Sequence, residues 1–216
     1  MRAGTIAGHV WIPPWRTLGA QKRSQRKECL VIAVIIIIVI LVLLGIIFAG
    51  MYNSLVSRRN QVDNAWSQID VQLKRRHDLI PNLVEAVKDY MSYEQETLTK
   101  VTAARAAAIN AGSQGPQAQA QAENMLTESL KSLFAVVENY PDLKANQNVL
   151  SLQEELTATE NKISFARQFY NDSVLTFNNK IQMFPSNLIA GMFNFTTRQF
   201  FEAPEGDREV PKVDLR

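Results

Sequence analysis

An unbroken apolar run near the N-terminus dominates the pattern of hydrophobic and polar positions. From Leu30 to Met51 the chain reads LVIAVIIIIVILVLLGIIFAGM, 22 residues without a charge, amide or hydroxyl group. A helix of that length is about 33 Å long, against roughly 30 Å for the hydrocarbon core of a bilayer. The run is also longer than the apolar region of a cleaved signal peptide. We therefore predict a retained transmembrane helix over residues 30–51.

After this run, hydrophobic residues recur every three or four positions, which is typical of an amphipathic helix. Pro81 interrupts the first stripe, so the helix either ends near Arg76 and restarts with Asp78 as N-cap, or runs through with a kink. The stripe keeps its phase across Pro81, which favours the kinked helix as far as Gly112. The stripe consists of Leu55, Val62, Trp66, Ile69, Leu73, Ile80, Leu83, Val87, Tyr90 and Val101.

A second helical stripe follows the loop-forming sequence NAGSQGPQAQAQA, which begins at Asn110. The residue before a proline is pushed out of the helical region, so this helix should end at Tyr140-Pro141. Its apolar face consists of Met125, Leu126, Leu130, Leu133, Phe134 and Val137.

A third and more regular stripe predicts a long helix with Asp142 as its N-cap, ended by Pro185. A short apolar piece rich in phenylalanine, SNLIAGMFNFTTRQFF, comes next. The remaining residues are rich in proline and charge, which predicts a disordered tail. The third stripe consists of Val149, Leu152, Leu156, Ile163, Ala166, Tyr170, Val174, Phe177, Ile181 and Phe184.

These elements predict an all-α chain. It should consist of a basic leader (1–29), the transmembrane helix (30–51), a helical bundle (52–202) and the tail (203–216). Long helices joined by short loops bury their stripes as an elongated antiparallel up-and-down bundle, here about three long helices plus a short C-terminal apolar helix. A long, thin bundle has little interior, so we expect part of a stripe to meet a second copy of the chain.

The charges are distributed unevenly along the chain. Residues 1–51 carry six basic residues and one acidic residue, whereas the rest carries seventeen basic and twenty acidic residues. An acidic body argues against a nucleic-acid partner. Residues 10–29 hold five Lys or Arg and residues 52–71 hold two. The positive-inside rule then places the N-terminus in the cytoplasm and the bundle outside the cell (inner) membrane.

Common catalytic and cofactor motifs are missing from the sequence. One cysteine excludes an intrachain disulfide, and one cysteine with two histidines does not make a zinc site. The chain has no glycine-rich nucleotide loop, no G-x-S-x-G elbow and no Glu-x-x-His pair. We therefore expect no enzyme activity, catalytic residue, metal or cofactor. His77, in KRRHD, is predicted to be solvated or to cap a helix.

Two charged residues lie beside the apolar stripes. Asp70 flanks Trp66 on the first helix, and Arg167 lies between Ile163 and Tyr170 on the third. The two charges could form a buried pair between helices that sets their register. Alternatively, both side chains could reach water at the edge of the stripe.

Long segments of the chain resemble the LemA family of bacterial and archaeal membrane proteins. The resemblance covers about Tyr52 to Glu202 and rests on YNSLVSRRNQVDNAWSQIDVQLKRRHDLIPNLVEAVKDY, YPDLKANQNVLSLQEELTATENKISFARQFYNDSV and FPSNLIAGMFNF…FFE. It implies a single-pass membrane protein with a long helical bundle and no established enzymatic activity. For some members it implies the opposite orientation, with the body in the cytoplasm. Motif residues that become candidates for framework or interhelical roles are Trp66, Asp70, Pro81, Tyr140, Pro141, Arg167, Tyr170 and Asn171.

Two functions are compatible with these features. The favoured one is a non-enzymatic, membrane-anchored scaffold or interaction protein that self-associates as a homo-oligomer and organises the membrane or an unidentified protein partner. The alternative is an extracytoplasmic sensor, in which the bundle binds a small ligand between its helices and signals through a partner.

Overall fold

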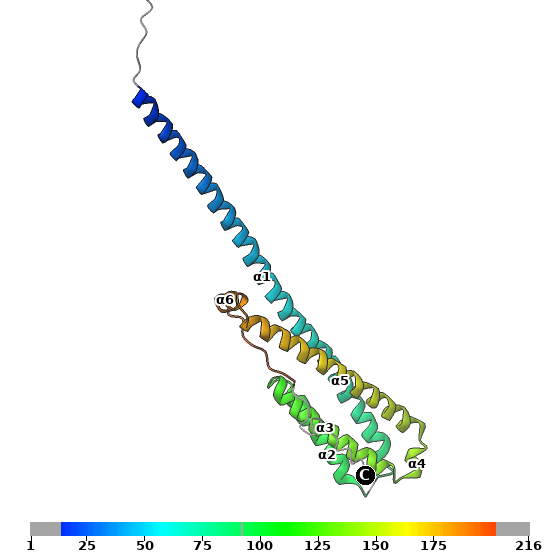
Figure 1. Ribbon diagram of the computed structural model, residues 1–216. Coiled ribbons are helices and arrows are strands. Elements are labelled where there is room, and N and C mark those ends of the chain that lie inside the picture. The colour runs from blue at the N-terminus through cyan, green and yellow to red at the C-terminus, as the bar shows by residue number, and fades with distance from the viewer. Residues whose placement is uncertain (1–13, 92, 202–216) are drawn as a thin grey trace, which may run out of the picture. The chain divides into compact units, whose positions relative to one another are not determined.

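Helices make up nearly all of the part of the chain that the structure describes. The computed structural model describes the backbone of residues 14–91 and 93–201, and the side chains of residues 30–91 and 93–201. The predicted tail (203–216) and the start of the predicted leader lie outside these ranges. Within them, no strand occurs and the all-α prediction is confirmed. The helices are α1 (Pro14–Lys88), α2 (Gln95–Ala111), α3 (Pro116–Val137), α4 (Pro141–Lys144), α5 (Gln147–Gln182) and α6 (Ser186–Met192) (Figure 1).

The chain divides into two compact units, residues 1–51 and 52–216. In the first unit, every side chain from Leu30 to Gly50 is exposed. Among the described residues, the helix that contains them is the one long and apolar enough to cross a membrane. Isoleucine, valine and leucine exposed on every side of a helix match the hydrocarbon interior of a bilayer.

In the second unit, α1 continues through Pro81, as the phase of the stripe predicts. The prediction that this helix extends to Gly112 is wrong. The chain turns after Lys88 and α2 begins at Gln95, so the unit contains four long helical segments instead of about three. The turn is closed by backbone hydrogen bonds from Met91 N to Val87 O and from Glu94 N to Met91 O.

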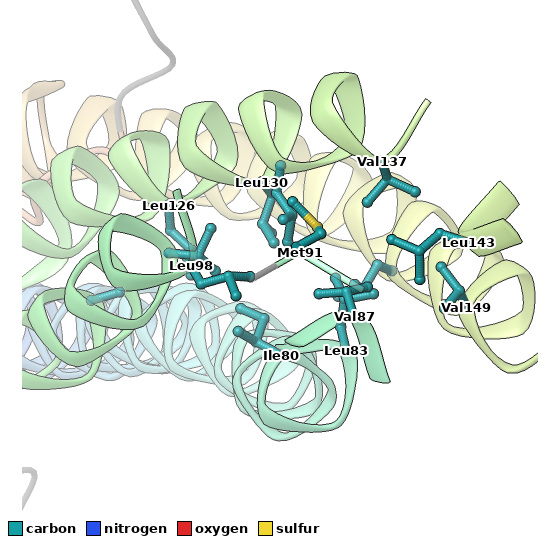
Figure 2. Packing of buried hydrophobic residues seen from close by; sticks show 14 residues of the cluster. Ile80, Leu83, Val87, Met91, Leu98, Leu126, Leu130, Val137, Leu143 and Val149 are labelled. Atoms are coloured by element: carbon teal, nitrogen blue, oxygen red, sulfur yellow. The ribbon is translucent and has the colours of Figure 1, made fainter. Parts of the chain in front are cut away.

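Two clusters of buried side chains form the core of this unit. Figure 2 shows the first, in which side chains from the end of α1 pack with those of α2, α3, α4 and the start of α5. The second joins the part of α1 after Tyr52 to α5, with Ala120 of α3 and Phe201 near the end of the described chain. Stripe members that the structure places at the surface are Tyr90, Met125 and Phe184.

The start of α5 differs from the prediction. Asp142 lies in the short helix α4, and the N-cap of α5 is Asn146. The Asn146 side-chain oxygen accepts hydrogen bonds from Asn148 N at 3.0 Å and Val149 N at 3.4 Å. Asparagine and aspartate cap equally well, so propensity did not separate the two positions. Leu143, which is fully buried between them, sets the position of α4.

We predict that Asn146→Ala lowers the free energy of unfolding of the bundle by about 1 kcal/mol, because two amides at the start of α5 lose their acceptor. Asp142→Ala is the matched control and should change it by less than about 0.5 kcal/mol, since Asp142 is exposed. Thermal unfolding of both full-length variants in micelles, followed by circular dichroism, measures the difference. A larger loss in Asp142→Ala would show that the cap is assigned to the wrong residue.

Candidate interaction surface and buried polar cluster

A cluster of charged and polar side chains lies between three helices, with Arg76, His77 and Glu123 buried and Thr127 and Glu160 half-buried at its edge. Arg76 of α1 is 2% exposed, and its Nη1 lies 3.0 Å from Glu160 Oε2 of α5 and 3.6 Å from Glu123 Oε2 of α3. Its Nη2 donates a hydrogen bond of 2.6 Å to Thr127 Oγ1. The next residue, His77, has its Nε2 2.7 Å from Glu123 Oε1. We call these five residues the polar cluster.

The polar cluster corrects the interpretation of His77 as a solvated or capping residue. His77 is buried, because KRRHD turns its second arginine and its histidine inward while Lys74, Arg75 and Asp78 stay exposed. A buried guanidinium is costly unless carboxylates and hydroxyls satisfy it. Glu123 and Thr127, one helical turn apart, supply such groups from α3. In the sequence, the four-residue spacing of Glu123 and Thr127 was the only sign of this cluster, and the same spacing is common on solvent-exposed helices.

Pro81 contributes to the same region through the backbone. A proline has no N–H, so the carbonyl of His77, four residues earlier, loses its usual helical donor. Arg105 of α2 replaces that donor, with its Nε 2.7 Å from His77 O. The proline ring itself is exposed. Pro81 therefore leaves the His77 carbonyl available for a bond that links α1 to α2. This replacement bond explains why α1 tolerates an internal proline.

A second set of polar contacts ties the extended segment Phe195–Phe201, here called the C-terminal strap, to α5. Asn171 pairs with both backbone groups of Phe201: its Nδ2 donates to Phe201 O at 2.8 Å, and its Oδ1 accepts from Phe201 N at 2.9 Å. Asn178 pairs in the same way with Arg198, at 2.9 Å for each bond. Seven helical residues rise about 10.5 Å and three extended residues span about 10 Å, so the two spacings match.

Aromatic side chains hold the strap against α1 as well. The Trp66 ring centroid lies 5.3 Å from that of Tyr170 and 5.9 Å from that of Phe201. Arg167 lies over the Phe201 ring, 5.0 Å from its centroid. Tyr170 is buried, and its hydroxyl donates to Gln199 O at 2.9 Å. The structure thus brings together four candidate residues, Trp66, Arg167, Tyr170 and Asn171, around the strap.

Burial raises the pKa of the Tyr170 hydroxyl above its ordinary value of 10.0; the positive charge of Arg198 opposes this shift and the negative charge of Asp63 adds to it. The hydroxyl therefore stays protonated and able to donate at neutral pH. Asp63 and Arg198 also face each other directly, with Arg198 Nη2 3.1 Å from Asp63 Oδ1.

The remaining candidate residues lie elsewhere. Asp70 is exposed, so it takes no part in a buried pair with Arg167. Pro141 occupies the first position of α4, where a missing N–H is tolerated, and Tyr140 precedes it half-buried against the first core cluster. Among the described residues no group of three or more His, Cys, Asp or Glu is placed to hold a metal ion.

An open groove runs along α1 and α5, and its apolar residues have no cover in the described part of the chain. Phe165 is 74% exposed, and Val71 and Phe169 are exposed beside it. One stretch of about 600 Å³ is lined by these three residues together with Ser67, Gln68, Gln72, Lys162 and Ala166. A second stretch of about 580 Å³ continues past Gln68 and Phe169 along the amide-rich face of α1. We call the surface around both stretches the α1–α5 face.

Comparison with known proteins matches this bundle. Residues 65–215 match the family model described as the LemA family. The chain belongs to the LemA family. It is 28% identical over 171 residues to Protein LemA of Metamycoplasma hominis, covering 79% of this chain and 78% of that protein. Together with the apolar segment 30–51, family membership makes this a membrane-associated protein.

More distant relatives include proteins of magnetic bacteria. The chain is 24% identical over 184 residues to Magnetosome protein MamQ 2 of Paramagnetospirillum magneticum, covering 74% of this chain and 68% of that protein. It is 23% identical over the same length to Magnetosome protein MamQ of Magnetospirillum gryphiswaldense, with the same coverage. Every residue of the polar cluster and the strap lies within the part of this LemA-family chain that matches the family model.

We predict that Arg105→Met lowers the free energy of unfolding by about 1–3 kcal/mol, because it leaves the carbonyl of His77 without a donor. In a Pro81→Ala background the restored amide of residue 81 can bond that carbonyl. The same Arg105→Met change should then cost clearly less. Thermal unfolding of the wild type, both single variants and the double variant gives the coupling. Strictly additive effects would contradict the proposed link.

We further predict that Tyr170→Phe lowers stability near neutral pH and flattens its alkaline decline. Because the folded-state pKa of Tyr170 is raised, the unfolded chain loses this proton at lower pH than the folded chain. The contribution is therefore complete below about pH 10 and is lost as pH rises through the higher folded pKa. Melting temperatures between about pH 8 and 11 should fall more steeply for the wild type than for Tyr170→Phe. Tyr93→Phe, at a fully exposed position, should keep the wild-type slope.

Proposed function

We propose that this LemA-family protein is a membrane-anchored, non-enzymatic scaffold that self-associates through its α1–α5 face. The observation that carries the proposal is the exposed pair Phe165 and Phe169 beside Val71, on a part of the bundle whose inner side is well packed. Exposed aromatic residues around a groove mark interaction sites more often than chance surface positions. The magnetosome relatives are named for a cellular structure and not for a reaction, which supports a role without catalysis.

A second copy of the chain fits this face for electrostatic reasons. In a two-fold contact the same patch meets itself, so a patch of one charge sign would repel its copy. Lys162 is the only charged side chain that lines the groove, and most of the polar lining consists of glutamine and asparagine. An amide both donates and accepts hydrogen bonds, so an amide-rich face is complementary to itself. A shared membrane anchor raises the local concentration of copies in one orientation.

The anchor and the leader set the proposed topology. Five Lys or Arg in residues 10–29, against two in residues 52–71, favour a cytoplasmic N-terminus and a bundle outside the cell (inner) membrane. The lipid bilayer is then the first partner, and the self-associated bundles would present their remaining surfaces to an as yet unidentified protein partner.

The sensor alternative is less well supported. A cavity of about 190 Å³ does lie between α1, α3 and α5, lined by Arg76, Thr127 and Glu160 among others. The Arg76 guanidinium, however, is already bound to Thr127 and Glu160. A ligand that used it would first have to break these contacts, which makes a structural role for the cavity wall the better account.

We predict that the full-length protein forms dimers in micelles and that Phe165→Glu with Phe169→Glu weakens them by about tenfold or more, because the apolar contact is replaced by facing like charges. Leu175→Glu is the matched control: it lies on the same helix, is half exposed and does not line the groove. Mass measurement across a range of protein-to-detergent ratios gives the dissociation constants.

The control variant should dimerise like the wild type, and all variants should keep the helical circular dichroism of the wild type. A wild type that stays monomeric at the highest protein-to-detergent ratio would contradict self-association. Dimers that survive the double substitution would contradict the α1–α5 face as their interface.

A further inference from the structure

A group of large apolar side chains projects from the region of α6. Phe184 is 77% exposed and Met192 is 69% exposed, and Met183 and Leu188 are exposed to a similar degree. We call Met183, Phe184, Leu188 and Met192 the apolar tip. Leu188 and Met192 are four residues apart, so they lie on one face of α6. Apolar side chains of this size with more than half of their surface exposed are unusual as a group on a water-facing part of a protein.

The opposite face of α6 is also apolar, and it is already used inside the bundle. Ile189 and Ala190 are buried, and the buried Ser186 hydroxyl bonds to Lys180 O at 2.7 Å and Met183 O at 2.9 Å. The chain has no charged residue from Ile181 to Thr197. A surface helix normally turns a polar face to water. One apolar face of α6 packs inside the bundle, whereas the second apolar face is exposed and carries no charged residue.

Aromatic residues that follow α6 contact the first residue after the apolar segment. The Phe193 ring centroid lies 4.7 Å from that of Tyr52, and the Phe195 ring centroid lies 6.1 Å from it. Tyr52 directly follows Met51, the last residue of the apolar segment. Residue 52 must therefore stand at the edge of the hydrocarbon when residues 30–51 span it. Arg59 lies over the Phe195 ring, 5.5 Å from its centroid.

We propose that the apolar tip inserts into the interfacial region of the same bilayer that holds the anchor, so that the bundle rests on the lipid as well as being tethered to it. Interfacial helices combine apolar residues below, aromatic residues at headgroup level and basic residues that meet lipid phosphates. The apolar tip supplies the first, Tyr52 and Phe193 the second, and Arg59 with Lys180 the third. The inference rests on the membrane anchor and not on self-association through the α1–α5 face.

Spin labels at single cysteines test the proposal in the full-length protein. Cys29→Ser provides the background, and labels are placed at Leu188→Cys and Met192→Cys in vesicles of phosphatidylcholine and phosphatidylglycerol. Oxygen concentrates in the hydrocarbon and nickel ethylenediaminediacetate stays in water, so the ratio of their collision rates reports depth. We expect a ratio at both positions severalfold higher than at Tyr93→Cys, which lies in the exposed turn between α1 and α2.

A label at Val39→Cys, in the middle of the apolar segment, separates the two possible failures. A high ratio at residue 39 with a water-like ratio at residues 188 and 192 would overturn the insertion of the apolar tip alone. A water-like ratio at residue 39 as well would overturn the anchor and the insertion together. Labels at residues 188 and 192 shielded from both reagents would show that protein, such as a second copy, covers the tip, and would also overturn the proposal.

Discussion

The buried guanidinium of Arg76 is the constraint around which the bundle is arranged. A charge so fully removed from water must be met by acceptors in fixed positions, and these come from two other helices, Glu123 and Thr127 of α3 and Glu160 of α5. His77 contacts the second oxygen of the same Glu123 carboxylate. Sliding α1 or α3 by a turn would break several of these contacts at once, and sliding α5 would break the contact between Arg76 and Glu160, whereas an apolar stripe alone tolerates such a shift.

The C-terminal strap applies the same principle to an extended segment. Asn171 and Asn178 offer side-chain amides that act as a backbone partner would, and their spacing on α5 matches three residues of strap. The strap then reaches α1 through the contact between Arg198 and Asp63. These polar contacts set the register of α1 and α5. The two helices can therefore stay aligned although the groove along them has no cover in the described part of the chain.

The two proposed contacts of the bundle use different exposed surfaces: the α1–α5 face for self-association and the apolar tip for lipid. The α1–α5 face is amide-rich and nearly uncharged, which suits contact with an identical copy. Phe193, which follows Met192 of the apolar tip, contacts Tyr52, and Tyr52 directly follows the apolar segment that we propose as the anchor. Copies that lie on the lipid in one orientation would present their α1–α5 faces at the same height, so the two proposed contacts support each other.

Local patterns in the chain were enough to predict a helix long and apolar enough to cross a membrane, the all-α class and the continuity of α1 through Pro81, because each depends on helical periodicity or on an unbroken apolar run. They did not predict the turn after Lys88, the inward orientation of His77 or the cap at Asn146. Phe165 and Phe169 lie one position before the half-buried Ala166 and the buried Tyr170, so a stripe analysis passes over them. Only tertiary packing decides which neighbouring face of a helix is covered, because periodicity shows that a face is apolar but not what lies against it.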